Sequence, residues 1–554
     1  MNNLKPVVKQ SIKSKKSIQQ IDFLSNIDSY FQNKLNLFFR IFFALSILFT
    51  ILLFNFRVSV GGDDAAYIIR ASDFINHFKY PSFQGPLYPF VLSILILFFG
   101  INIPLLKLLS AIFLALHLYI LFKTFKIRVP NFVLISSIAL ISINSYLAFF
   151  ASQTYSETFF MLLQILFFAY FFKNFITDNI ENYNIKIQII RYLIIGFFVF
   201  LMGITKSIGN ISLIAIIIYF VFEKKWKAIS YSIASFSLFF SVWKAIKMIL
   251  WGNQTSQFTE QAKVLFQKHP YDPSLGQETF FGFFNRLIDN SNLYFSKHLY
   301  TLFGLRPDVC SPIPFLAIII VIALLISFIA VYKKNKYLLF TGIYLFLMLG
   351  FTFVILQTIW ESIRLILAFF PFFVLFFIGG FYYLFKDINL KNYQFILVFL
   401  VAFLFYFSFT NSIEKIEKHK PILKENFKGN LLAGLSPDWV NYIKMCKWVA
   451  DNIPENERIA CRKPNISFIY TNRRFYGIYK VNSENADTLL QNLYKNNVKY
   501  IIMASLRKFE ERKSEYTINT IQRYLYYIQT KYPEKIKPLY QIGNDEPAYL
   551  FKIN

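Results

Sequence analysis

The sequence is poor in charged residues and in cysteine. Only 16% of its 554 residues are charged, whereas soluble globular proteins average about 25%. The three cysteines, Cys310, Cys446 and Cys461, are too few for a cysteine-rich zinc or iron–sulfur site. They could form one disulfide, which the sequence itself does not show. Because 56% of the residues are hydrophobic, the composition excludes a disordered chain, a disulfide-based scaffold and an ordinary cytosolic enzyme.

Acidic residues are also scarce, since 31 Asp and Glu stand against 58 Lys and Arg, for a net charge of +27. Most basic residues lie in short loops between apolar runs, where the orientation of a membrane protein places them. We therefore expect no nucleic acid as a partner. The sequence also has no phosphate-binding loop and no dinucleotide fingerprint, which favours a lipid-linked substrate over a nucleotide-linked one.

Long apolar runs predict a polytopic α-helical membrane protein. The first run, at about 37–56, follows a polar stretch that is too long for the n-region of a signal peptide, so we expect it to remain as a span. Crossing the bilayer takes about 20 apolar residues. Further runs that predict spans lie near 104–123, 130–150, 156–173, 188–204, 209–222, 228–249, 312–332, 337–358, 363–384 and 392–409.

The run at 86–100 decides the orientation of the chain. It has only 15 residues between Pro86 and Gly100, a length typical of an interfacial or re-entrant helix. If it does not cross, the basic loops all face the cytoplasm, as the positive-inside rule requires. The sequence therefore predicts about 11 spans in a bacterial cytoplasmic membrane, with the N-terminus inside and the C-terminus outside.

This orientation predicts three parts. Residues 1–36 form a basic cytoplasmic tail, and residues 37–410 form the transmembrane domain. Its outer loops are 57–103 and 250–311, and the second is expected to pack over the site and help to choose the acceptor. Residues 411–554 are expected to form a small extracytoplasmic α/β domain, in which Ser436-Pro437 begins a helix. Its expected strands lie at 458–461, 498–504 and 548–553, with helices between them near 485–496 and 516–530.

Two adjacent carboxylates, Asp63 and Asp64, follow the first span. Placing them together costs desolvation and like-charge repulsion. The cost makes sense if one carboxylate is a general base, or if the pair binds a metal or a polar substrate. The alternative is a solvated loop in which Asp64 caps a helix at 65–78, and the pair alone leaves both interpretations open.

Four more charged residues are expected at the outer boundary of the membrane: Glu157, Lys206, Glu361 and Arg364. Each alone fits a helix terminus, a surface ion pair or a snorkelling cation. Together with Asp63 they converge on one face, and the two cations indicate an anionic ligand, because Arg grips phosphate with two hydrogen bonds. The pattern suits a phosphate whose lipid tail lies in the bilayer.

Transfer of a sugar from a lipid phosphate needs such a set of groups. Cations stabilise the negative charge that develops on the leaving phosphate. A carboxylate removes the proton of the acceptor hydroxyl. Helices lined with Phe and Ile hold the polyprenyl chain.

The order of these residues resembles that of the GT-C glycosyltransferases, polytopic enzymes that use polyprenyl-phosphate sugars and include protein O-mannosyltransferases and the aminoarabinose transferases of lipid A. The segment Asp63-Asp64-Ala65-Ala66-Tyr67 is similar to the family's Asp-Glu-x-x-Tyr. The other segments that resemble family motifs are Gln84-Gly85-Pro86-Leu87-Tyr88-Pro89 (Pro-Pro-Leu-Tyr), Tyr155-Ser156-Glu157 (Ser-Glu), Thr205-Lys206-Ser207 (Thr-Lys-Gly) and Arg364 with Pro371 (Arg…Pro). Gly85 and Ser207 depart from these motifs. The soluble tail resembles the small periplasmic domain of many members.

The resemblance implies a role for each residue. Asp63 would be the general base or would orient the acceptor, and Asp64 would support it or bind an ion. Lys206 and Arg364 would hold the donor phosphate. The residues expected to bind substrate are Tyr67, Gln84, Tyr88, Glu157 and Glu361. No cofactor is implied, although a divalent cation at Asp63 and Asp64 stays open, because some relatives use one and others do not.

The sequence thus predicts a transferase that moves a sugar from a polyprenyl phosphate to a hydroxyl of a glycolipid, another glycan or a protein, at the outer face of the membrane. The alternatives are a transporter or flippase of lipid-linked saccharides, a polymerase or ligase of them, and a non-catalytic scaffold. A transporter would place its acids along a midplane path, and a ligase would carry its main residues in a late outer loop. The early Asp63-Asp64 pair favours the transferase.

Overall fold

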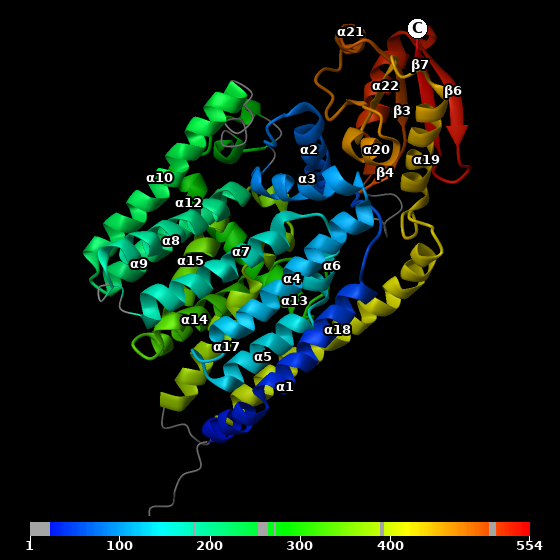
Figure 1. The fold of residues 1–554 in the computed structure, drawn as a ribbon. Helices are drawn as coiled ribbons and strands as arrows, with labels where there is room; N and C mark the ends of the chain where they lie inside the picture. Colours follow the sequence, from blue (N-terminus) through cyan, green and yellow to red (C-terminus); the bar gives the residue numbers. More distant parts are fainter. Residues whose placement is uncertain are drawn as a thin grey trace, which may run out of the picture.

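The computed structural model describes residues 23–82, 84–178, 180, 183–252, 264–270, 273–387, 393–508 and 517–554. These residues form a helical bundle and a small α/β domain beyond one end of it (Figure 1). The predicted fold class is therefore confirmed. Residues 1–22 of the expected cytoplasmic tail lie outside the described residues, as do 253–263 and 271–272 of the second expected outer loop.

Eight helices among the described residues are long and apolar enough to cross a membrane. They are α1 (Phe23–Leu52), α4 (Ile103–Phe125), α7 (Ser156–Phe171) with its π-helical continuation η1 (Phe172–Thr177), α8 (Ile185–Thr205), α10 (Trp226–Trp251), α14 (Pro314–Val331), α15 (Lys336–Ile355) and α18 (Phe395–Phe427). Shorter apolar helices occupy the other expected spans: α5 (Asn131–Ser142), η3 (Ser207–Asn210) with α9 (Ile211–Phe222), and α17 (Phe370–Asp387). The total of about 11 spans stays a prediction.

One expected span, 130–150, is two helices. The helix α5 ends at Ser142, and α6 (Ser145–Phe150) follows it. The Asn144 side chain accepts hydrogen bonds from the N–H groups of Tyr146, at 3.1 Å, and Leu147, at 3.0 Å. Such a cap satisfies the first N–H groups of a new helix, so the chain breaks where hydropathy alone showed one continuous run.

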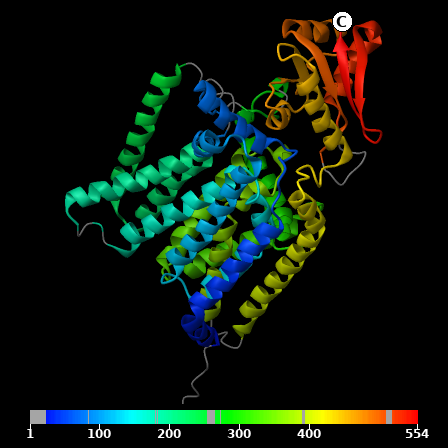
Figure 2. The ribbon, with the colours of Figure 1, turned by 45° about the vertical axis from the view of Figure 1, so that its right-hand side comes forward.

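The segments expected outside the membrane contain short helices. The helix α2 (Asp63–His77) corresponds to the expected helix at 65–78, and α3 (Leu87–Phe99) corresponds to the short run at 86–100. Both lie at the end of the bundle that faces the C-terminal domain (Figures 1 and 2). The remaining short helices of these segments are η5 (Pro273–Leu275), α12 (Phe280–Leu293), the π-helix η6 (Tyr294–His298), α13 (Leu299–Leu302) and η7 (Thr358–Trp360). The helix α16 (Arg364–Leu367) begins the expected span 363–384.

The C-terminal domain is a mixed five-stranded sheet of order β2-β1-β3-β7-β6. The strand β1 pairs in parallel with β2 and β3, and β7 pairs antiparallel with β3 and β6. Its elements are α19 (Pro437–Asn452), β1 (Arg458–Cys461), α20 (Pro464–Thr471), β2 (Tyr476–Gly477), α21 (Ala486–Lys495), β3 (Val498–Met503), β4 (Leu506–Arg507), β5 (Thr517–Ile518), α22 (Thr520–Lys531), η9 (Pro533–Lys535), β6 (Ile536–Ile542) and β7 (Ala548–Ile553).

The predicted strands β1, β3 and β7 and the predicted helices α19, α21 and α22 are confirmed. The sequence did not predict β6, because the five residues Lys537–Gln541 are all exposed on this edge strand and show no apolar alternation. The cysteines of the domain form no disulfide. The Sγ atoms of Cys446 and Cys461 instead lie 3.2 Å and 3.6 Å from the Ser467 hydroxyl.

The C-terminal domain shares a hydrophobic core with the start of the bundle. Val58 and Ala65, on either side of the turn into α2, pack in one buried cluster with Trp439, Tyr442 and Ile466 of the C-terminal domain. The helix α20 lies against α2 (Figure 1). The segment 57–65 is therefore packed between the bundle and the sheet domain.

We expect Leu550→Ala to destabilise the C-terminal domain by about 2–5 kcal/mol, because it opens a cavity in a close-packed core. The Leu550 side chain on β7 is fully buried. The matched control is Leu539→Ala on β6, where the leucine is 51% exposed, and it should change stability by less than about 0.5 kcal/mol. Thermal unfolding of the purified full-length protein in detergent measures both, and equal melting temperatures for the two variants would contradict this packing.

Candidate functional site

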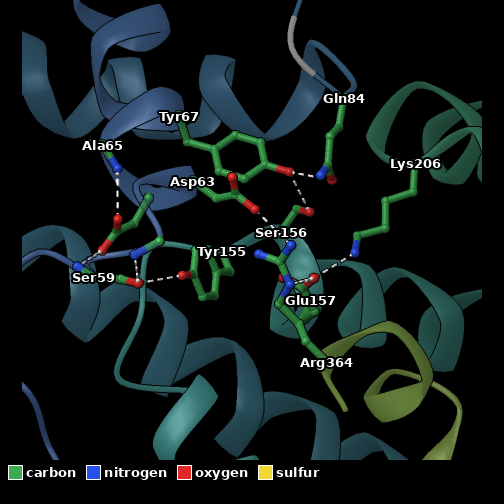
Figure 3. Close-up of polar contacts among 12 residues, drawn as sticks. Ser59, Asp63, Ala65, Tyr67, Gln84, Tyr155, Ser156, Glu157, Lys206 and Arg364 are labelled. Carbon is green, nitrogen blue, oxygen red and sulfur yellow. Dashed lines mark hydrogen bonds and ion pairs between the residues drawn. The ribbon is translucent and has the colours of Figure 1, made fainter. Parts of the chain in front are cut away.

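Four of the predicted charged residues meet in one ion-pair network (Figure 3). Arg364 at the start of α16 donates from Nη2 to Asp63 Oδ2 at 2.7 Å, and its Nε lies 3.5 Å from Glu157 Oε1. Lys206 Nζ lies 2.8 Å from the same Glu157 oxygen. The network joins α2, α7, the end of α8 and α16, although Asp63 and Arg364 are 301 residues apart in the chain.

The four side chains are buried to different degrees. Glu157 is only 3% exposed, Arg364 is 15% and Lys206 is 16% exposed, whereas Asp63 is 33% exposed. The buried Glu157 carboxylate therefore lies between the two cations, and Asp63 is the more exposed of the two carboxylates in the network. Arg364 thus faces the carboxylates of both Asp63 and Glu157, and an arginine side chain keeps its positive charge in proteins.

Local structure explains where each charge lies. Glu157 is in the first turn of α7 and Lys206 follows the last turn of α8, so each charge complements the dipole of its helix terminus. The N-cap residue of α7 is Tyr155, which makes no side-chain capping bond. Gly62, at φ 89°, turns the chain into α2 and puts Asp63 at its first position.

Tyr67 and Gln84 lie beside the network (Figure 3). The Tyr67 hydroxyl donates to Gln84 Oε1 at 2.7 Å and lies 2.9 Å from the Ser156 hydroxyl, next to Glu157. The Tyr88 ring packs edge-on against Tyr67 at 5.1 Å. Tyr88 is fully buried and packs against Tyr67, and its contact with substrate stays a prediction.

Asp64 lies apart from the carboxylate of Asp63. Its side chain is fully buried and accepts hydrogen bonds from the backbone N–H groups of Ser59, at 2.7 Å, and Ala65, at 2.9 Å. Burial raises the pKa of Asp64. Consecutive residues of a helix point about 100° apart, so Asp63 faces Arg364 while Asp64 faces the backbone. The alternative in which Asp64 caps α2 is wrong, because Gly62 is the N-cap.

Glu361 belongs to a separate cluster. Its carboxylate forms an ion pair with Lys297 and lies 3.3 Å from His298 Nε2, both on the π-helix η6. None of its recorded ion pairs involves Asp63, Glu157, Lys206 or Arg364. The structure therefore does not join Glu361 to the network, although the chain places it three residues before Arg364.

Three residues that contact the network or lie near Asp64 were not among the predicted site residues. Tyr155 lies under Arg364, with its ring 4.6 Å from the guanidinium, and its hydroxyl donates to Ser59 Oγ at 2.8 Å. Lys107 is fully buried in α4 and donates from Nζ to the Arg57 carbonyl and, at 2.9 Å, to Gln153. Lys107 could have been identified from the sequence, because a lone lysine inside an apolar run indicates a functional or paired residue. Nothing in the sequence singled out Ser59. In the part of the chain described, no three His, Cys, Asp or Glu gather as metal ligands.

We expect Glu157→Gln to lower stability by about 3 kcal/mol, because it removes the anion between two largely buried cations. The control is Glu223→Gln, which breaks a pair with Lys336, a lysine that is 61% exposed; such a surface pair contributes about 0–1 kcal/mol. Melting temperatures in detergent compare the two. A Glu157→Gln protein as stable as the Glu223→Gln protein would contradict the buried network.

Comparison with solved structures identifies the fold. ArnT from Cupriavidus metallidurans bound to undecaprenyl phosphate is 10% identical and has a TM-score of 0.55, covering 92% of this chain and 97% of that chain; its apo state gives 9% and 0.54 with the same coverage. The archaeal oligosaccharyltransferase AglB from Archaeoglobus fulgidus, in complex with an inhibitory peptide and a dolichol-phosphate, is 11% identical, has a TM-score of 0.52 and covers 92% of this chain and 74% of that chain.

No family model and no curated protein matches the sequence. Identities near 10% establish architecture and nothing finer. The resemblance nevertheless covers both the bundle and the C-terminal domain, because it extends over 92% of the chain. On this evidence the chain has the GT-C fold that ArnT and AglB share.

Proposed function

We propose that this protein is a membrane glycosyltransferase that moves one sugar from a polyprenyl-phosphate donor to a hydroxyl acceptor at the outer face of the cytoplasmic membrane. The observation that carries the proposal is the contact of Asp63 with Arg364 in a GT-C fold. It puts the more exposed of the two carboxylates in the network next to a cation that can hold a phosphate. The printed ligands of the similar structures, undecaprenyl phosphate in ArnT and dolichol-phosphate in AglB, support a lipid-phosphate donor.

The donor phosphate would bind between Lys206 and Arg364. Both cations lie within 3.5 Å of one oxygen of Glu157, so a single phosphate group can contact both. As the bond between the sugar carbon C1 and the phosphate oxygen breaks, the electron pair stays on the phosphate. The ammonium and the guanidinium stabilise that charge, and they do so most strongly in a site that is largely closed to water.

Asp63 would take the proton of the acceptor. The acceptor hydroxyl oxygen forms the new bond to C1 on the face opposite the phosphate, and its proton passes to the Asp63 carboxylate. Because Arg364 contacts Asp63 as well as the proposed phosphate site, one guanidinium sets the distance between base and leaving group. The Gln84 amide, which is only partly buried, would orient the sugar, and the buried Tyr67 hydroxyl, which lies beside that of Ser156, would hold the amide in place.

We infer that Asp63 and Asp64 do not share a divalent cation. Both oxygens of Asp64 already accept backbone hydrogen bonds, and the side chain is fully buried. Asp63 is bonded to Arg364. A divalent cation held by the pair would have to displace these contacts, so Asp63 and Asp64 fit such a cation poorly. The catalytic roles proposed above therefore involve no metal ion.

A strain comparison tests the function. We expect deletion of the gene to remove one sugar from an envelope glycolipid, glycan or glycoprotein, and the wild-type gene to restore that sugar. The Asp63→Asn gene should restore less than about 1% of it, since a general base accelerates a reaction by about 10²- to 10⁴-fold. Mass spectrometry of the envelope measures the product and identifies the sugar and the acceptor. Asp178→Asn, which alters a residue paired with Arg191, is the control and should restore the product fully.

Full restoration by a stably expressed Asp63→Asn protein would overturn the role of Asp63. An unchanged envelope after deletion would overturn the transferase itself and move transport or scaffolding ahead.

Binding of undecaprenyl phosphate tests the donor site separately. We expect Lys206→Met to weaken binding by about 10- to 100-fold, because a hydrogen bond to a charged group contributes about 1.5–3 kcal/mol. Lys418→Met, which removes a lysine that is 72% exposed on α18, should leave the affinity unchanged. Titration of the purified protein in detergent measures both, and equal affinities for the two variants would place the phosphate elsewhere.

A further inference from the structure

The segment just before Asp63 is held from the C-terminal domain. Lys463, the residue that precedes α20, donates from Nζ to the carbonyls of Val60, at 3.1 Å, and Gly61, at 3.2 Å. In the same domain the Tyr470 hydroxyl accepts a hydrogen bond from the Val58 N–H at 3.2 Å. The side chains of Lys463, at the N-cap of α20, and Tyr470, within α20, thus both hydrogen-bond to the backbone of residues 58–61.

The same segment aims Asp63. Gly62 donates its N–H to the Ser59 carbonyl at 3.0 Å, and its positive φ sends the chain into α2 with Asp63 as the first residue. The Val60 and Gly61 carbonyls lie inside this turn. A shift of the turn would therefore move the Asp63 carboxylate relative to Arg364, 2.7 Å away.

The surroundings of Lys463 suit a fixed contact. Its Nζ lies 5.9 Å from the centre of the Trp439 ring, and the backbone N–H of Lys463 donates to the Tyr442 hydroxyl at 3.3 Å. Trp439 and Tyr442 are both fully buried in the cluster that also holds Val58 and Ala65. The lysine stem therefore lies against a packed core while its ammonium reaches across to the turn.

We propose that Lys463 is a positioning residue for sugar transfer: by binding the Val60 and Gly61 carbonyls, the C-terminal domain holds the turn that aims Asp63 at Arg364 and at the acceptor. The inference rests on the proposed function, because it gives the C-terminal domain a part in that reaction. It makes this domain a component of the catalytic centre rather than an attached module.

Two variants of the full-length protein test the proposal. Lys463→Met keeps the stem and removes the ammonium, and it should reduce formation of the envelope product on the order of 10- to 100-fold, the cost of a small misplacement of a reacting group. Lys463→Arg, which can still donate to both carbonyls, should recover most of the product. Lys499→Met is the matched control, because this lysine is 59% exposed and pairs with Glu457 in the same domain; it should act as wild type.

Two further measurements separate aiming from binding and from folding. Undecaprenyl phosphate should bind Lys463→Met and wild type with affinities within about twofold, because the variant leaves Lys206 and Arg364 in place. Hydrogen exchange by mass spectrometry should be faster in the peptide that spans 57–66 of Lys463→Met, where the held turn loosens, and unchanged in Lys499→Met.

Each contrary result identifies what fails. Unchanged exchange at 57–66 would show that Lys463 does not hold the turn, and unchanged product would show that its contact with the turn does not serve sugar transfer; either result would overturn the proposal. If Lys463→Met lost product and undecaprenyl phosphate binding to the same extent, the substitution would act on the donor site or on folding, and the proposal would also be overturned. A wild-type protein that forms no product would instead overturn the proposed function, and the exchange measurement would still decide whether Lys463 holds the turn.

Discussion

The structure depends on a buried carboxylate that keeps two cations together. Glu157 lies in the first turn of α7 with its side chain almost fully enclosed, and Lys206 and Arg364 both contact its Oε1. Without this anion the two cations would repel each other in a region with little water to screen them. With it, they form a paired cationic surface on which Arg364 still reaches Asp63. The cations that the proposal assigns to the phosphate and the carboxylate that it assigns to the acceptor are therefore parts of one network.

The second constraint comes from the far end of the chain. The turn before α2 shares a hydrophobic cluster with the C-terminal domain and is bonded to Lys463 and Tyr470. The position of a carboxylate at the start of a helix, such as Asp63, depends on the turn that precedes the helix. Packing this turn between bundle and sheet domain gives it a fixed position, although it lies at the surface of the membrane domain. The proposal thus gives a role to a small C-terminal domain whose own strands carry none of the predicted site residues.

Much of the fold could be predicted from the sequence, because hydropathy records which helices are surrounded by lipid or protein. The strands β1 and β7 were also predicted with correct bounds, since buried strands keep an apolar pattern. The edge strand β6 and the break at Asn144 could not be predicted in this way. The first is exposed, and the second depends on one capping side chain.

The site was partly predictable for a similar reason. Asp63, Glu157, Lys206 and Arg364 stood out because charge is costly at a membrane boundary, and they do meet. Their functional roles stay a prediction. The sequence could not show that Asp64 turns inward to the Ser59 N–H, that Glu361 pairs with η6, or that Lys463 reaches the turn. Each of these depends on side-chain direction or on contacts between segments far apart in the chain.

The most direct test of the central claim is a cryo-electron microscopy structure of the full-length protein with undecaprenyl phosphate. We expect density for the phosphate in contact with both Lys206 Nζ and the Arg364 guanidinium, beside the Asp63 carboxylate, with the lipid chain along apolar helices. A phosphate bound away from these two cations would contradict it.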